Sequence, residues 1–298
     1  MIPETRAELF RAARRKRVWV ILALVGIVVP AITLAVAKFT DTRAGGTFVD
    51  SDGTVTRIVD AFTGPYGLAS NNLLGVWAMV YLVLPLVAAN LLIGEERGLK
   101  TWKVILPAQP NRARVLAGKF LAGLALVGLW LVGGGALAAL IGLLGGPLLG
   151  LPGSGGDWLD LLARYGAQLL LLTGPLALGF LASWIIASPG LALATALVGP
   201  SILEGAALLI APTFLRPLNI LNAAVQALEL QRRIQAMQEW FFTVNASLGA
   251  GRAGRAIMAG TSDVTWEGIG HSLIVMAVYS AVFAVLLVAS FLRRDVHE

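Results

Sequence analysis

Long apolar stretches separated by polar segments dominate the chain. Six of them hold about 20 or more mostly apolar residues, the length at which a helix crosses the hydrocarbon core of a bilayer. They predict an all-α membrane protein with a single transmembrane domain over residues 1–298 and six transmembrane helices, at about 18–37, 71–93, 116–144, 161–187, 190–211 and 268–292. Turns rich in glycine and proline separate the third, fourth and fifth spans.

Two polar segments near the N-terminus lie outside these spans. Residues 2–17 predict an N-terminal interfacial amphipathic helix, with Leu9 and Phe10 dipping into the bilayer and the arginines facing anionic headgroups. Residues 38–70 contain several glycines and aspartates, which predict an outer loop with a short hairpin around 47–58.

The long segment 212–267 separates spans 5 and 6. Apolar residues recur in it at spacings of four, three and four from Leu230 to Phe241, which is the period of a helix with one apolar face. Charged residues such as Arg232 fall on other faces. The pattern predicts an outer amphipathic segment of one or two helices that lie at the outer interface.

The composition supports the membrane assignment and excludes several kinds of site. Charged residues make up 13% of the chain, about half of the roughly 25% in a soluble domain. The chain has no cysteine and two histidines, His271 and His297, so disulfides, thiolate zinc sites, iron–sulfur clusters and multi-histidine metal sites are excluded. We expect no cofactor. The net charge of +6 does not indicate nucleic-acid binding, because the basic residues flank apolar spans.

The distribution of lysine and arginine predicts the orientation. Six fall in residues 1–17, six in 94–119 and two at 293–294, so 14 of the 23 lie on one side of a six-span chain. By the positive-inside rule this side is the cytoplasm, and both termini are cytoplasmic. A cleaved signal peptide ending at Ala37 is the alternative for the first span, but its apolar part of about 19 residues exceeds the usual 7–15.

An acidic pair, Glu95 and Glu96, follows the second span directly. Two carboxylates at the inner interface are costly unless they are paired or exposed to water. The segment that follows carries both charge signs and the interfacial anchor Trp102, which is typical of a short helix that docks on a soluble partner. The alternative is a solvated loop whose basic residues only set the topology.

This segment resembles the permease subunits of ABC-2-type transporters. The resemblance is carried by Gly94-Glu95-Glu96-Arg97-Gly98-Leu99-Lys100-Thr101, by Pro107-Ala108-Gln109-Pro110-Asn111-Arg112 and by Gly118-Lys119 at the start of span 3. The layout is similar too, with a basic N-terminal helix, six spans and amphipathic helices before the last span. Lys100 and Gln109 depart from the usual pattern.

The resemblance implies a transmembrane subunit of a bacterial exporter in the cell membrane, with a peptide, lipid or drug-like substrate. It implies a cytoplasmic coupling segment over 94–115 that contacts a separate ATP-binding cassette ATPase, and a second permease subunit, identical or related. The ATPase-coupling residues that it indicates are Glu95, Glu96, Arg97, Gly98, Thr101 and Trp102.

The chain lacks the means to hydrolyse ATP through a P-loop. That motif ends in Gly-Lys-Ser/Thr, with another glycine five positions before the Gly-Lys pair. The Gly-Lys pair of this chain, Gly118-Lys119, is followed by Phe120 and has Ala113 at the first glycine position. We therefore expect the chain to be no enzyme, and ATP to be hydrolysed in a partner subunit.

Glu204 lies inside the fifth span. An ionised group there costs about 2.5–3.5 kcal/mol on insertion scales, so it is expected to face protein or a water-filled cavity. We interpret it as a residue of the translocation path or of the subunit interface. The alternative is a structural pair with an amide such as Gln168 in a neighbouring span.

Two other functions compete with this interpretation. A gradient-driven carrier usually has several intramembrane acids or repeated broken helices, whereas Glu204 is a single acid and no repeat is evident. An intramembrane protease of the Glu-Glu-x-x-x-Arg type would need an arginine where Lys100 stands and further membrane histidines. A serine–histidine pair would have to use Ser154, in a glycine-rich outer turn, with His271.

Overall fold

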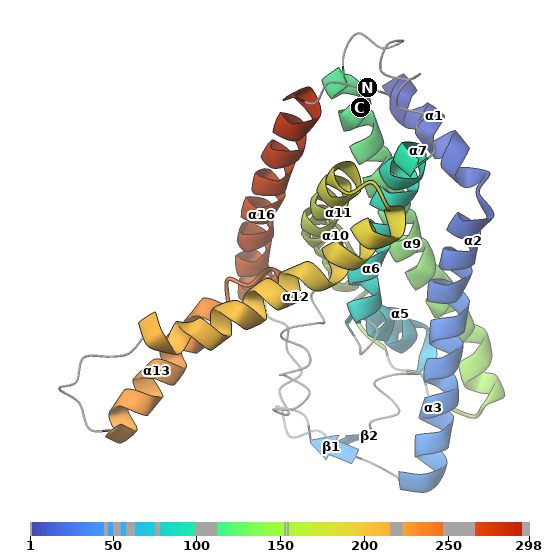
Figure 1. Cartoon of the computed structure of the whole chain (residues 1–298). Helices are drawn as coiled ribbons and strands as arrows, with labels where there is room; N and C mark the ends of the chain where they lie inside the picture. The colour runs from blue at the N-terminus through green and yellow to red at the C-terminus, as the bar shows by residue number, and fades with distance from the viewer. Residues whose placement is uncertain are drawn as a thin grey trace.

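The structure is a computed structural model that describes residues 2–44, 47–49, 55–57, 63–74, 78–98, 112–151, 153, 155–214, 223–246 and 266–293. Nearly all of these residues are helical, which confirms the all-α fold. The exception is a hairpin of β1 (Thr47–Val49) and β2 (Val55–Arg57), antiparallel with Thr47 opposite Arg57, where a hairpin was predicted. It lies at the opposite end of the bundle from α1 (Ile2–Ala13) (Figure 1).

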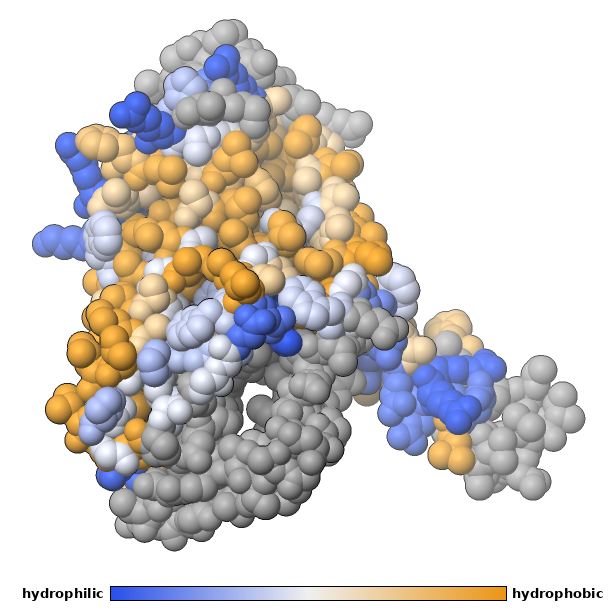
Figure 2. All heavy atoms as spheres, turned by 180° about the vertical axis from the view of Figure 1, so that it is seen from behind, coloured by the Kyte–Doolittle hydropathy of each residue, from blue (hydrophilic) through white to orange (hydrophobic). Residues whose placement is uncertain are grey.

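Within the described residues, five helices are long and apolar enough to cross a membrane: Lys16–Phe39, Ala113–Leu148, Trp158–Ile185, Pro189–Pro212 and Gly268–Phe291. They match the predicted spans 1, 3, 4, 5 and 6 to within a few residues. Figure 2 shows a broad band of apolar side chains across the face in view, with hydrophilic side chains above and below it. The chain is therefore a multi-pass membrane protein.

These spans are built from several helical pieces. The first consists of α2 (Lys16–Ala23), the π-helical turn η1 (Leu24–Val28) and α3 (Val29–Ala44). The others are α9 (Arg112–Leu148), α10 (Trp158–Leu171) with α11 (Thr173–Ile185), α12 (Pro189–Phe214) and α16 (Trp266–Arg293).

The second predicted span, 71–93, has a different layout in the structure. Its first residues belong to α5 (Gly64–Leu74), which packs on α9 at the end of the bundle away from α1 (Figure 1). Gly64, with a φ of 78°, and Pro65 start this separate helix, because glycine tolerates a positive φ and proline suits the first helical turn. The crossing part is then α6 (Ala78–Ala89), η2 (Asn90–Gly94) and α7 (Glu95–Gly98), and the count of six spans stays a prediction.

Both amphipathic segments contain helices. In α1, Glu8 and Ala12 are buried against the protein and Leu9 packs on the core, whereas Phe10 is 58% exposed. The predicted bilayer-facing pair Leu9–Phe10 is therefore split between the two sides of the helix. Between spans 5 and 6 the structure has α13 (Ala223–Gln238) and the short α14 (Phe242–Asn245).

Glycines allow close packing around the central helix α9. An added Cβ on Gly134 would lie 2.9 Å from Val25 in η1, and one on Gly26 would lie 2.6 Å from Leu137. Such contacts need small residues, as expected where membrane helices approach closely. The buried Trp130 indole then donates a hydrogen bond of 3.0 Å to the Val18 carbonyl, which joins α9 to α2.

The closest backbone approach is at Gly142, and it predicts a specific loss of stability. A Cβ there would lie 2.3 Å from the carbonyl oxygen of Gly64, an atom of the backbone that cannot rotate away. Gly142→Ala is therefore expected to destabilise the protein by about 1–3 kcal/mol, because α5 has to move off α9. Thermal unfolding of the purified protein in detergent measures this loss.

Gly128→Ala is the matched control, because its Cβ would meet Leu169 at an ordinary 3.7 Å. It is expected to be neutral or to stabilise by up to about 1 kcal/mol through helix propensity. Equal melting temperatures for the two variants would show that α5 does not pack on α9 as described.

Candidate functional site

Four charged side chains meet where α1, α7 and the start of α9 come together, at the end of the bundle that also holds the end of α16 (Figure 1). They are Glu8 and Arg11 of α1, Glu96 of α7 and Lys119 of α9, and we name them the Lys119 cluster. Two are acidic and two are basic, so the cluster is balanced in charge.

Lys119 lies at the centre of the cluster and is 1% exposed. Its Nζ lies 2.7 Å from Glu8 Oε1 and 2.8 Å from Glu96 Oε2, and it donates to the Leu92 carbonyl at 3.3 Å. Arg11 contacts the same two carboxylates, at 2.9 Å to Glu8 and 3.3 Å to Glu96. Each carboxylate therefore has two cationic partners.

A more exposed set of ion pairs surrounds the cluster. Arg15, between α1 and α2, lies 3.0 Å from Glu95, and Arg17 pairs with the same carboxylate. Arg114 lies 2.9 Å from Glu4. The N-terminal helix is thus bound through side chains to both the end of η2–α7 and the start of α9.

The burial of the Lys119 cluster determines what it can do. Removing one partner of a buried ion pair costs about 3–5 kcal/mol, because the remaining charge has lost its water and its counterion. The cluster therefore resists separation of α1, α7 and α9. Glu96 is joined to α1 through Arg11 and to α9 through Lys119.

The predicted coupling residues fall partly on this site. Glu95 and Glu96 begin α7. Glu96 pairs with Arg11 of α1, whereas Glu95 pairs with Arg15 and Arg17 at the start of α2. Arg97 lies over the Trp184 ring at 5.6 Å. Gly98 ends α7, whereas Thr101 and Trp102 lie outside the described residues. The last residues of the predicted coupling segment 94–115, from Arg112 onward, belong to α9.

The sequence analysis missed the partners of the acidic pair. Glu8 is one of two acids among the first 17 residues, and Lys119 stands at the start of a long apolar run. An acid in a basic segment and a lysine beside an apolar run are both unusual, and this is the signal that could have indicated an ion pair. The chain separates Lys119 from Glu8 by 111 residues, so spacing alone does not join them.

Glu204 lies in a second polar site, on α12. Its carboxylate accepts a hydrogen bond of 3.1 Å from the Thr243 backbone amide and another from the Thr243 hydroxyl. Gln168, the predicted alternative partner, instead donates to the Ala246 carbonyl at 3.5 Å. The acid of α12 is therefore bound by Thr243 in α14 rather than by the amide of Gln168.

The turn around α14 is held against α16 by three further polar contacts. Ser272 donates to Asn245 at 2.8 Å, and Tyr279 donates to the Trp240 carbonyl at 3.2 Å. The Nε2 of His271 lies 3.0 Å from the Glu239 carbonyl. Because a carbonyl only accepts, the imidazole nitrogen is the donor in this contact. The serine proposed for a protease, Ser154, lies outside the described residues.

Substitutions of Glu204 distinguish its hydrogen bonds from its charge. Glu204→Leu is expected to cost about 1–3 kcal/mol, because it leaves the part-buried Thr243 amide without its acceptor. Glu204→Gln retains an acceptor and is expected to stay within about 1 kcal/mol of the parent protein. Thermal unfolding of both variants in detergent measures the difference. Equal losses would mean that Thr243 does not depend on this side chain.

Among the described residues, no group of three or more histidine, cysteine or acidic side chains is arranged to hold a metal ion.

Comparison with known proteins gives one family. A family model described as ABC-2 family transporter protein matches residues 5–296, which include most of α1, the Lys119 cluster and all five long apolar helices. No match was found among curated proteins.

Proposed function

Because the chain belongs to the ABC-2 family of transporter proteins, we propose that it is the permease of an ATP-driven exporter and is coupled to a separate ATPase subunit. The sequence has no P-loop, which supports a partner as the site of ATP hydrolysis. The observation that carries the proposal is the Lys119 cluster, because it joins the predicted coupling residue Glu96 to two other elements at the basic end of the bundle.

In the proposed mechanism, ATP binding closes the ATPase dimer, and the segment that begins at Glu95 moves with it. The Lys119 cluster transmits this displacement to α1 and to the third span. No chemical step takes place in this chain. Work is done because the nucleotide-bound ATPase prefers one arrangement of the spans over the other.

We place α1 and the Lys119 cluster on the cytoplasmic side of a bacterial cell membrane. Among the described residues, most of the lysine and arginine lies at this end, as the positive-inside rule requires. Helix α1 and the last turn of α16 lie at the same end (Figure 1), which supports an even number of spans.

A second permease subunit, identical or related, is proposed to pack along α12. Of the most apolar 18-residue stretch of this helix, only 6% is buried inside the protein. Leu203 and Leu209 are 73% and 81% exposed. Glu204 lies on the same helix, which would place it at the subunit interface beside the path of the substrate. A peptide, a lipid and a drug-like molecule are the substrate classes that the family resemblance suggests.

Affinity purification of the tagged chain from its native membrane, in mild detergent, tests the proposal. Mass spectrometry is expected to find a P-loop ATPase in stoichiometric amount, and the mass of the intact complex gives the number of permease copies. A chain that purifies without an ATPase, yet transports its substrate in vesicles with an ion gradient alone, would replace this proposal with the gradient-driven carrier.

A further inference from the structure

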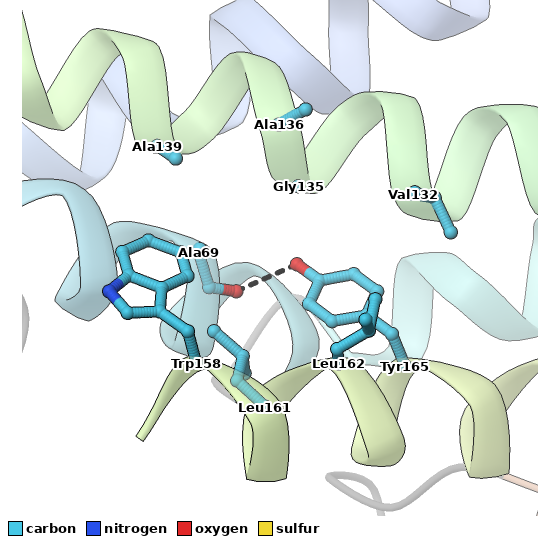
Figure 3. A pocket seen from close by; sticks show the side chains of 9 residues that line it. All are labelled: Ala69, Val132, Gly135, Ala136, Ala139, Trp158, Leu161, Leu162 and Tyr165. Atoms are coloured by element: carbon cyan, nitrogen blue, oxygen red, sulfur yellow. Dashed lines mark hydrogen bonds between the residues drawn. The ribbon is translucent and has the colours of Figure 1, made fainter. Parts of the chain in front are cut away.

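A groove of about 140 Å³ lies between α9 and α10, against α5 (Figure 3). The residues that line it are Ala69, Val132, Gly135, Ala136, Ala139, Trp158, Leu161, Leu162 and Tyr165. It belongs to neither the Lys119 cluster nor the Glu204 site.

Contacts with neighbouring elements fix the two aromatic side chains of the groove. The Tyr165 hydroxyl donates a hydrogen bond of 2.8 Å to the Ala69 carbonyl, and Gly135 leaves room for that hydroxyl, since a Cβ there would lie 2.2 Å away. The Trp158 ring packs edge-on against Tyr66, with ring centroids 5.5 Å apart. The groove is therefore formed before any ligand enters, as in most small-molecule sites.

The opening of the groove faces the hydrocarbon of the bilayer. Val132 and Leu162 flank it with 47% and 60% exposure, and both lie within long apolar helices. Its polar groups are turned away from a ligand: the Tyr165 hydroxyl bonds Ala69, and the Trp158 nitrogen lies on the far side of its ring (Figure 3). A polar ligand would find no partner here.

The length and width of the groove suit a single hydrocarbon chain. From Trp158 to Tyr165 helix α10 rises about 10 Å at 1.5 Å per residue, which is part of one leaflet. Trp158 is half-exposed at the first residue of α10, where tryptophan commonly marks the headgroup level. A second helix, about 10–12 Å in diameter, is too wide to enter a space of 140 Å³.

We propose that this groove binds one acyl chain of a membrane phospholipid, with the headgroup at the Trp158 end. The proposal needs only the membrane location of the chain and does not rest on its role in transport.

Photo-crosslinking with a lipid probe tests the proposal. The full chain is reconstituted in vesicles of phosphatidylethanolamine and phosphatidylglycerol that contain a phosphatidylcholine with a diazirine on one acyl chain. After illumination, labelled peptides are identified by mass spectrometry. The label is expected to concentrate on Val132–Ala139 and Leu161–Tyr165, above other lipid-exposed positions of α9 and α16.

Variants that fill or open the groove give the decisive comparison. Ala139→Leu is expected to lower labelling of the groove about tenfold, the equivalent of about two fewer buried methylene groups. Ala125→Leu adds the same bulk to an exposed position of α9 outside the groove and is expected to leave the labelling unchanged. Trp158→Ala removes a side chain that lines the groove and adds no bulk. It is expected to lower the labelling of the groove as well. A loss of labelling in Ala139→Leu alone would then be recognised as an effect of overpacking.

Labelling that is spread evenly over α9 and α16 and unaffected by Ala139→Leu would overturn the proposal, because the lipid would then be ordinary surrounding bilayer. Groove peptides that remain unlabelled while other bilayer-facing positions of α9 are labelled would also overturn it, since protein would then cover the site.

Discussion

Lys119→Met is expected to cause the largest loss of stability of any single substitution at the charged end of the bundle. It removes the buried cation that contacts the carboxylates of Glu8 and Glu96 and leaves them the half-exposed Arg11. Breaking a buried ion pair costs about 3–5 kcal/mol, and the loss is expected near 3 kcal/mol because Arg11 still contacts both acids. Thermal unfolding of the purified protein, followed by tryptophan fluorescence, measures this loss.

Arg114→Met is the matched control on the same helix. Arg114 pairs with Glu4 at 2.9 Å but is 51% exposed, so water and salt screen the pair. Its loss is expected to cost less than about 1 kcal/mol. If both methionine variants lowered the melting temperature equally, Lys119 would not be the centre of a buried ion-pair cluster.

Glu95→Arg is expected to have the largest effect on coupling to the ATPase. Glu95 pairs with Arg15 and Arg17 and is partly exposed, so reversing its charge detaches α7 from the start of the first span with little loss of stability. The stimulation of ATP hydrolysis by the reconstituted permease should fall about tenfold, within the ~1–3 kcal/mol of a typical coupling between two sites. The measurement is the ATPase rate of the complex in vesicles.

A charge exchange separates the pairing from other effects of the substitution. Adding Arg15→Glu to Glu95→Arg restores opposite charges between α7 and the segment before α2, and is expected to recover most of the stimulation. Two results would show that coupling does not pass through Glu95. One is normal stimulation of ATP hydrolysis by Glu95→Arg alone, and the other is a double variant that recovers none of the lost stimulation.

The spans could be predicted from the sequence because hydrophobic length alone determines which helices cross a bilayer. The second predicted span, 71–93, starts within α5, because Leu73 and Leu74 continue the apolar run toward the N-terminus. In the structure α5 starts at Gly64, ends at Leu74 and packs against α9, and α6 starts at Ala78. A length criterion does not detect such a break.

Of the residues in the candidate site, the sequence predicted the acidic pair but not its partners. The acidic pair Glu95–Glu96 stands out because carboxylates are costly next to a span. Their partners come from α1 and α9, far away in the chain, and are joined by tertiary packing. Glu204 was likewise recognised because a charged group is costly inside an apolar span. Its partner Thr243 follows 39 residues later, and no sequence spacing predicts that the two residues meet.

Site-specific crosslinking from the predicted coupling segment tests the central claim most directly. The chain contains no cysteine, so Thr101→Cys provides a single attachment point for a photoreactive maleimide. Leu228→Cys, at a 63% exposed position of the outer helix α13, is the control. We predict that Thr101→Cys forms an adduct with a P-loop ATPase in native membranes and that Leu228→Cys forms none. An ATPase captured equally from both positions, or from neither, would contradict a coupling segment that contacts a separate ATPase.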